Sequence, residues 1–136
     1  NGWKDEAGRY DYGTQNAALY EGLNMAIGFI NELGMSKIQL RTTSLSNYLI
    51  EKLNAKVGNK VRILTPEEEA SRSSIVSFVP LSGDYSELFQ LAYQSGFRVR
   101  KVPEAGLNAI RVSTHIFNNY AELDSFINFV EEYLNK

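Results

Sequence analysis

Apolar residues recur at the three- and four-residue spacing of a helix in four stretches of the chain. The first two stretches, residues 16–33 and 36–57, are separated by Gly34. Thr14 or Asn16 is suited to cap the first helix, because a short polar side chain accepts a hydrogen bond from the free N–H groups there. We expect the apolar stripes to face a core. On the first helix the stripe consists of Leu19, Leu23, Ala26, Ile27, Ile30 and Leu33.

The other two helical stretches each open with polar residues at capping-box spacing. Asp84 with Glu87 opens the third helix, and Asn119 with Glu122 opens the last. Gly96 ends the third helix, since glycine adopts the left-handed backbone that commonly follows a helix. Both helices carry apolar stripes, which on the last one are formed by Leu123, Phe126, Ile127, Val130 and Leu134.

Between the helices the pattern changes to the two-residue alternation of strands, at residues 61–64, 74–79, 97–102 and 109–114. The second of these is almost entirely β-branched or aromatic, so we expect it to be the central strand, covered on both faces. The element order is α-α-β-β-α-β-β-α. This order predicts an α+β fold, in which an antiparallel sheet of about four strands carries helices on one face.

The last strand places an arginine opposite its apolar face. Ile110 and Val112 lie on the apolar side, whereas Arg111 and Ser113 lie on the other. A guanidinium held on a strand is well shaped for two parallel hydrogen bonds to a carboxylate. Two interpretations remain open: an ion pair with a carboxylate of the protein, which is the commoner case, or a site for an anionic ligand. Arg100, on the preceding strand, is a second candidate for the same uncovered face.

Few residues in the chain offer other chemistry. His115, the one histidine, follows the strand in a loop, where it is either an acid or base beside Arg111 or simply bonded to backbone. No cysteine is present, so thiol chemistry and disulfides are excluded for this chain. The side chains of Glu67–Glu69 point in different directions, which argues against a cation site. We therefore expect no metal site.

Length and charge restrict the remaining possibilities. The 136 residues suit one domain with a net charge of −2, which gives no electrostatic signature of a nucleic-acid or membrane partner. No apolar run approaches the roughly 20 residues that span a bilayer, and no secretory signal is visible, so we expect a cytoplasmic protein. Residues 1–13 lack periodicity and predict an extended or disordered N-terminal segment, and 14–136 form the domain. Trp3, Tyr10 and Tyr12 are unusual in such a segment and suggest that it packs on something outside this chain. Asn1 in place of methionine suggests a fragment.

Five segments, taken together and in order, resemble the C-terminal small domain of class V aminotransferases. They are Asp-Tyr-Gly-Thr-Gln-Asn (11–16), Asn-Glu-Leu-Gly (31–34), Ser-Ile-Val-Ser-Phe (74–78), Ile-Arg-Val-Ser-Thr-His-Ile-Phe-Asn (110–118) and Glu-Leu-Asp (122–124). Class V aminotransferases are pyridoxal phosphate enzymes of fold type I. Isopenicillin N epimerase-like and cysteine desulfurase-like members are the most similar.

The resemblance implies roles for particular residues. Arg111 corresponds to the family's arginine that binds the α-carboxylate of an amino-acid substrate, while Arg100 falls near a second family arginine and His115 is a further candidate for the substrate site. Gly13 and Thr14 correspond to a pair that approaches the cofactor phosphate of the neighbouring subunit in a homodimer, as a helix start with a hydroxyl can. Alternatively, Thr14 only caps the helix.

The resemblance also implies what this chain lacks. The lysine that binds pyridoxal phosphate lies in the large domain of such enzymes, so we expect the isolated chain to be inactive and without covalently bound cofactor. The turn at 103–106 has no counterpart of the desulfurase cysteine, which excludes persulfide chemistry here and leaves epimerase, lyase or transaminase chemistry open. The domain would bind the substrate carboxylate and close the cleft. The alternative is a non-catalytic binding module with the same fold.

Overall fold

The computed structural model describes residues 6–10, 13–14 and 16–136. The chain divides into two compact units, one that ends at Met35 and one that runs from Ser36 to Lys136, and each unit is described by itself. The packing expected for Trp3 and Tyr12 lies outside the described residues.

The first unit contains one short and one long helix. Within the expected N-terminal segment, residues Ala7–Tyr10 form a 3₁₀ turn, and Ala17–Leu33 form helix α1. Asn16 caps α1, because its Oδ1 accepts a hydrogen bond from the Leu19 N–H at 3.2 Å. The suggestion that Thr14 caps this helix is therefore wrong. Gly34 ends α1 with a φ of 84°, a conformation that favours glycine.

The apolar stripe of α1 is exposed, and our expectation that it faces a core is wrong for the described residues. Leu19 is 71% exposed and Leu23 is 58% exposed, and no residue of α1 is buried. The physical reason is that a single helix cannot bury its own stripe, and its unit provides no second described layer to cover it.

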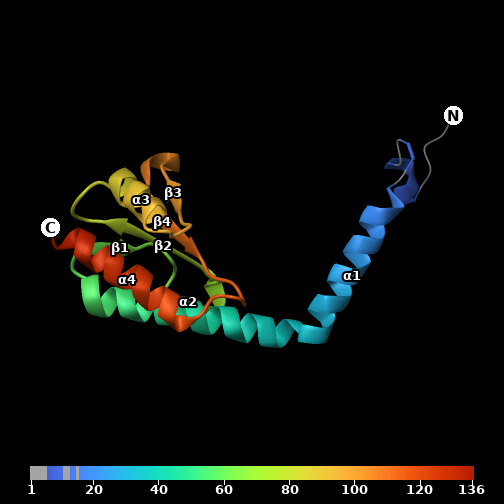
Figure 1. The fold of residues 1–136 in the computed structure, drawn as a ribbon, viewed down its shortest axis with the longest axis horizontal. Coiled ribbons are helices and arrows are strands. Elements are labelled where there is room, and N and C mark those ends of the chain that lie inside the picture. Colours follow the sequence, from blue (N-terminus) through green and yellow to red (C-terminus); the bar gives the residue numbers. More distant parts are fainter. Residues whose placement is uncertain (1–5, 11–12, 15) are drawn as a thin grey trace. The chain divides into compact units, whose positions relative to one another are not determined.

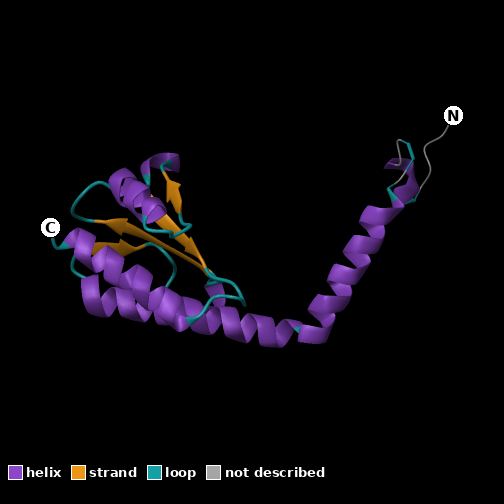
Figure 2. Cartoon of the chain, viewed as in Figure 1, coloured by secondary structure: helices purple, strands orange, loops and turns teal. Residues whose placement is uncertain are grey.

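The second unit is a four-stranded antiparallel sheet with three helices (Figures 1 and 2). The strand order is β1-β2-β4-β3, and every neighbouring pair is antiparallel. The elements are α2 (Met35–Val57), β1 (Val61–Ile63), η2 (Glu69–Ser71), β2 (Ile75–Pro80), α3 (Tyr85–Gln94), β3 (Arg100–Val102), η3 (Glu104–Gly106), β4 (Ala109–Ser113) and α4 (Tyr120–Leu134).

One face of the sheet joins the helices in a single core, as the sequence predicts. The strands contribute Val76, Phe78 and Ile110, all fully buried or nearly so. The helices meet these side chains with buried residues spaced at helical periods, namely Leu45, Leu49 and Leu53 of α2, Leu88 of α3, and Leu123, Phe126, Ile127 and Val130 of α4. Burial of these stripes supplies the main stabilisation of the unit.

The α-helices lie on one face of the sheet, as predicted, but two expectations about the strands are corrected. Strand β2 is central but is covered on only one face, because Ile75 on its other face is 40% exposed. Strand β3 is also shorter than predicted: residues 97–99 are irregular, although Phe97 and Val99 still pack against the core.

A tyrosine of α4 fastens the start of α3. The hydroxyl of Tyr133 accepts the Asp84 N–H at 3.0 Å and lies 2.9 Å from Glu87 Oε2, which can accept its proton. Burial raises the pKa of Tyr133 above its ordinary value, so the neutral hydroxyl is retained. The Glu87 side chain therefore links α3 to Tyr133 of α4, while the Asp84 side chain caps α3 by accepting hydrogen bonds from the Ser86 and Glu87 N–H groups.

Replacement of this hydroxyl tests the link. We expect Tyr133→Phe to lower the free energy of unfolding by about 1–2 kcal/mol, because it leaves the Asp84 N–H without its acceptor. Tyr93→Phe is the matched control, since Tyr93 is exposed on α3, and it should change the free energy by less than about 0.5 kcal/mol. Urea denaturation of both variants measures the difference, and equal stabilities would show that the link contributes nothing.

Candidate functional site

Arg111 occupies the middle of β4 and faces the side of the sheet that has no helix. Its neighbours in sequence, Ile110 and Val112, are buried in the core, so the alternation of the strand turns Arg111 to the other face. The register places Ser77 of β2 directly opposite Arg111 on one side and Arg100 of β3 directly opposite it on the other. These three side chains share one face of the sheet.

The guanidinium of Arg111 has no partner among the described residues. Its Nε is buried and makes no hydrogen bond, and Arg111 takes part in neither of the two ion pairs that the described part of the chain forms. A buried donor without an acceptor is costly, and native proteins rarely leave one unsatisfied. The described residues therefore do not support the interpretation of Arg111 as a structural ion pair.

Arg100 forms an ion pair, whereas Arg111 forms none with the described residues. Its Nη2 donates to Oε1 of Glu104 in the turn between β3 and β4, and both side chains are about half exposed. Because Arg100 and Arg111 are directly opposite each other, their like charges disfavour the pairing unless an anion lies near them. Glu104 compensates the charge of Arg100, which leaves Arg111 as the uncompensated charge.

His115 lies in the exposed loop that follows β4. Its backbone N–H donates to Asn118 Oδ1 at 2.8 Å, while its ring lies 4.8 Å from the ring of Phe117. The imidazole makes no hydrogen bond to any described residue, so the expectation that this side chain bonds to backbone is wrong. The structure places an aromatic pair here rather than an oriented acid or base.

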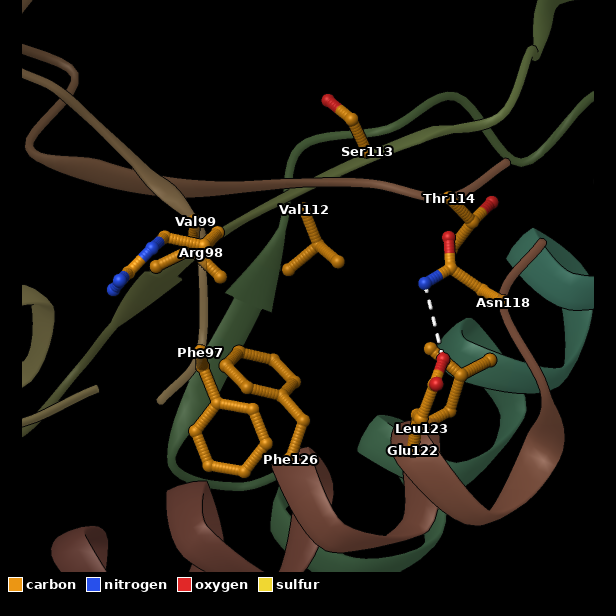
Figure 3. Close-up of a pocket in the computed structure, with 10 residues that line it drawn as sticks. All are labelled: Phe97, Arg98, Val99, Val112, Ser113, Thr114, Asn118, Glu122, Leu123 and Phe126. Carbon is orange, nitrogen blue, oxygen red and sulfur yellow. Dashed lines mark hydrogen bonds between the residues drawn. The ribbon is translucent and has the colours of Figure 1, made fainter. Parts of the chain in front are cut away.

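A small pocket of about 110 Å³ lies where β4 ends beside α4 (Figure 3). Its apolar wall includes Phe97 and Phe126, whose rings meet edge to face at 5.4 Å. Asn118 and Glu122 form its polar rim, where the Asn118 side chain donates a hydrogen bond to the Glu122 carboxylate at 3.1 Å. Arg111 does not line this pocket. The sequence did not reveal it, because residues from two loops, one strand and one helix form it.

Glu122 completes the capping box of α4 on this rim. Its carboxylate accepts hydrogen bonds from the Asn118 side chain and from the Asn119 N–H. These bonds, the one from Asn118 most of all, hold the pKa of Glu122 below its ordinary value. Because the folded pKa is the lower one, Glu122 stabilises the fold above its unfolded pKa and loses that contribution as the pH falls.

A larger groove of about 370 Å³ opens on the helix-free face. It is lined in part by Ser77, the residue opposite Arg111, and by Arg72 from the loop before β2. The Nε of Arg72 is also buried without a hydrogen-bond partner among the described residues. No spacing in the sequence distinguishes Arg72, since the loop that carries it lacks periodicity.

Gly13 and Thr14 belong to the first unit and are described apart from Arg111. Both residues are exposed, and a side chain added at Gly13 would meet no atom within 4 Å. Because Asn16 caps α1, the Thr14 hydroxyl is not used for that purpose.

No described helix is long and apolar enough to cross a membrane. Within the same residues, no three His, Asp or Glu side chains converge in a way that would hold a metal ion.

Comparison with known proteins identifies relatives. The family model of aminotransferase class V matches residues 1–126. Over 128 residues the chain is 26% identical to a "probable cysteine desulfurase" of Xylella fastidiosa, covering 88% of the chain and 30% of that protein. Over 131 residues it is 28% identical to "probable cysteine desulfurase 1" of Mycobacterium leprae, covering 90% and 21%. The chain thus spans less than a third of these relatives.

Solved structures show the same fold. The apo cysteine desulfurase of Thermococcus onnurineus matches with a TM-score of 0.84 and 20% identity, over 97% of the chain and 34% of that structure. A C-DES mutant whose cofactor, PLP, is covalently linked to glycine matches with a TM-score of 0.80 and 20% identity, over 97% and 33%. At these identities the likeness establishes the fold alone.

The pH dependence of stability tests the state of Glu122. We expect Glu122→Gln to be less stable than the wild type near pH 7, and the difference to shrink as the pH falls below about 4, where a free glutamate is protonated. Glu132→Gln removes the same charge from the same helix and serves as the control. A difference that stays constant from pH 7 to pH 3 would show that the carboxylate charge is not involved.

Proposed function

The chain belongs to the aminotransferase class V family, and we propose that it supplies the substrate-binding part of a pyridoxal phosphate-dependent enzyme that acts on an amino acid. The observation that carries the proposal is the buried Nε of Arg111, which has no described partner on a face without helices. A carboxylate is the ligand that a guanidinium fork fits best. The α-carboxylate of an amino acid would satisfy both the charge and the hydrogen bond.

The strand holds Arg111 in a fixed orientation. Its flanking residues are locked in the core and its backbone is paired on both sides, with Ser77 and Arg100. A bound carboxylate would therefore be positioned by a rigid element, as precise orientation of a reacting centre requires. Arg100 is directly opposite Arg111, but it is paired with Glu104, so Arg111 is the arginine that we propose binds the carboxylate.

Gly13 and Thr14 fit the cofactor role that the family resemblance implies. The start of α1 offers N–H groups, and the Thr14 hydroxyl is not used to cap the helix. We propose that these residues hold the phosphate of a cofactor bound to the neighbouring subunit of a cytoplasmic homodimer. When bound, pyridoxal phosphate supplies an electron sink for the bonds at the substrate's α-carbon.

The absence of cysteine limits the reactions in which this chain can take part. The curated relatives are named as cysteine desulfurases, but this chain has no cysteine, so none of its own residues can carry a persulfide. We propose epimerase, lyase or transaminase chemistry, with the catalytic lysine in a large domain of the same polypeptide. In that arrangement the present chain binds the substrate and closes the cleft, and it contributes no catalytic residue.

Substitution of Arg111 in the complete protein tests its role. We expect Arg111→Ala to lower kcat/KM by about one to two orders of magnitude, because a charge-assisted contact of about 1.5–3 kcal/mol is lost. Arg111→Lys should also lower it, since the ammonium keeps the charge but loses the planar fork. The melting temperature should change little.

Arg62→Ala is the matched control for this experiment. Arg62 lies on the edge strand β1, is exposed, and is directly opposite Val79 on the helix-free face, so its loss should leave kcat/KM unchanged. An Arg111→Ala protein that melts earlier yet keeps wild-type kcat/KM would show that Arg111 is a structural ion-pair partner.

The isolated chain should not retain pyridoxal phosphate covalently. The chain spans less than a third of its curated relatives, and we propose that the lysine that binds the cofactor lies in the large domain outside this chain. Mixing the chain with the cofactor and then desalting it should leave no stoichiometric visible absorbance. The complete protein, treated in the same way, is the control and should retain its absorbance. A stoichiometric band on the isolated chain would contradict the division of labour proposed here.

A further inference from the structure

Residues 64 and 65, at the start of the loop that precedes β2, extend the pairing of β1 along the edge of β2. The Leu64 N–H donates to the Ser77 carbonyl at 2.8 Å, and the Ser77 N–H donates to the Thr65 hydroxyl at 2.9 Å. These two bonds tie the loop to the middle of β2 at the residue opposite Arg111. Leu64 and Thr65, which line part of the groove, are therefore fixed relative to the sheet.

The groove is polar enough and large enough for a small ligand. Its volume of about 370 Å³ falls within the range of about 300–1,000 Å³ that is usual for ligand pockets. Four hydroxyl side chains and several apolar ones line it, together with one charged residue. The lining consists of Leu64, Thr65, Pro66, Ser71, Arg72, Ser73, Ile75, Ser77 and Leu107.

Arg72 gives this groove its positive charge. It is half-buried, and its Nε is buried with no acceptor among the described residues. The nearby acidic run Glu67–Glu69 does not line the groove and is exposed, and Glu68 accepts the Ser71 hydroxyl at 3.0 Å. No carboxylate in the described part of the chain neutralises Arg72.

Arg72 and Arg111 are neighbours of the same residue. Ser77 lines the groove with Arg72, and it is directly opposite Arg111 in the sheet, where paired Cβ atoms lie about 4.5–5.5 Å apart. Ser77 is thus directly opposite one arginine with an unsatisfied Nε and lines the same groove as a second. A ligand bound at Arg111 and extending over Ser77 would reach the groove of Arg72.

We propose that the amino-acid substrate carries a second anionic group on its side chain and that Arg72 binds this group while Arg111 binds the α-carboxylate. The inference rests on the proposed function, because it takes Arg111 as the carboxylate site. An apolar side chain would leave the buried Nε of Arg72 without an acceptor, and an anionic one would satisfy both its hydrogen bond and its charge. The Ser77 hydroxyl, which makes no hydrogen bond to the described residues, is positioned to contact the ligand between the two arginines.

Binding of two five-carbon acids to the complete protein tests the proposal. Glutarate and pentanoate differ only in the second carboxylate, and titration calorimetry measures both. We expect glutarate to bind about tenfold more tightly, the gain that one charge-assisted contact at a partly exposed site gives. In Arg72→Gln the two acids should bind almost equally, with pentanoate unchanged. Arg62→Gln removes an exposed arginine that does not line the groove and should alter neither affinity.

Further variants separate the possible failures. Arg72→Lys keeps the charge, so it should retain part of the preference for glutarate. That result would show that the loss of this preference in Arg72→Gln is not caused by misfolding. Equal binding of the two acids to the wild type would overturn the second site. So would a melting temperature that falls in Arg72→Gln while the glutarate preference persists, since Arg72 would then pair with another part of the protein. If Arg111→Gln weakens neither acid, the proposed function itself fails.

Discussion

The alternation of strand β4 is the constraint on which the site depends. Ile110 and Val112 are fixed in the core between the sheet and the helices, so the backbone has no freedom to turn Arg111 inward. A shift of one residue in register would expose the two apolar side chains and bury the guanidinium, at a large cost in free energy. The hydrophobic core therefore determines the position of a charged group that it never contacts.

The charges on the helix-free face determine whether Arg111 can bind a ligand. Arg100 and Arg111 are directly opposite each other, and only Arg100 has an acidic partner in the described chain. A buried guanidinium nitrogen without an acceptor, next to a second cation, favours the arrival of an anion. Arg72, in the groove that Ser77 also lines, likewise has a buried Nε without an acceptor among the described residues.

Much of this arrangement was predictable from the sequence, because it follows from local patterns. The helices, the four strands, the cap at Asn119 and the outward direction of Arg111 all follow from periodicity and capping chemistry. The groove at Arg72 was not predictable, since it depends on how an aperiodic loop folds back on β2. The sequence also suggested a core role for the stripe of α1, because periodicity indicates that a helix has an apolar face and not what covers it.

The most direct measurement of the central claim is a crystal structure of the complete protein with an unreactive amino-acid analogue bound. The account predicts that the α-carboxylate of the analogue lies within hydrogen-bond distance of the Arg111 guanidinium, including its Nε, on the helix-free face of the sheet. A structure in which a carboxylate of the protein occupies Arg111, while the carboxylate of the analogue binds elsewhere, would contradict it.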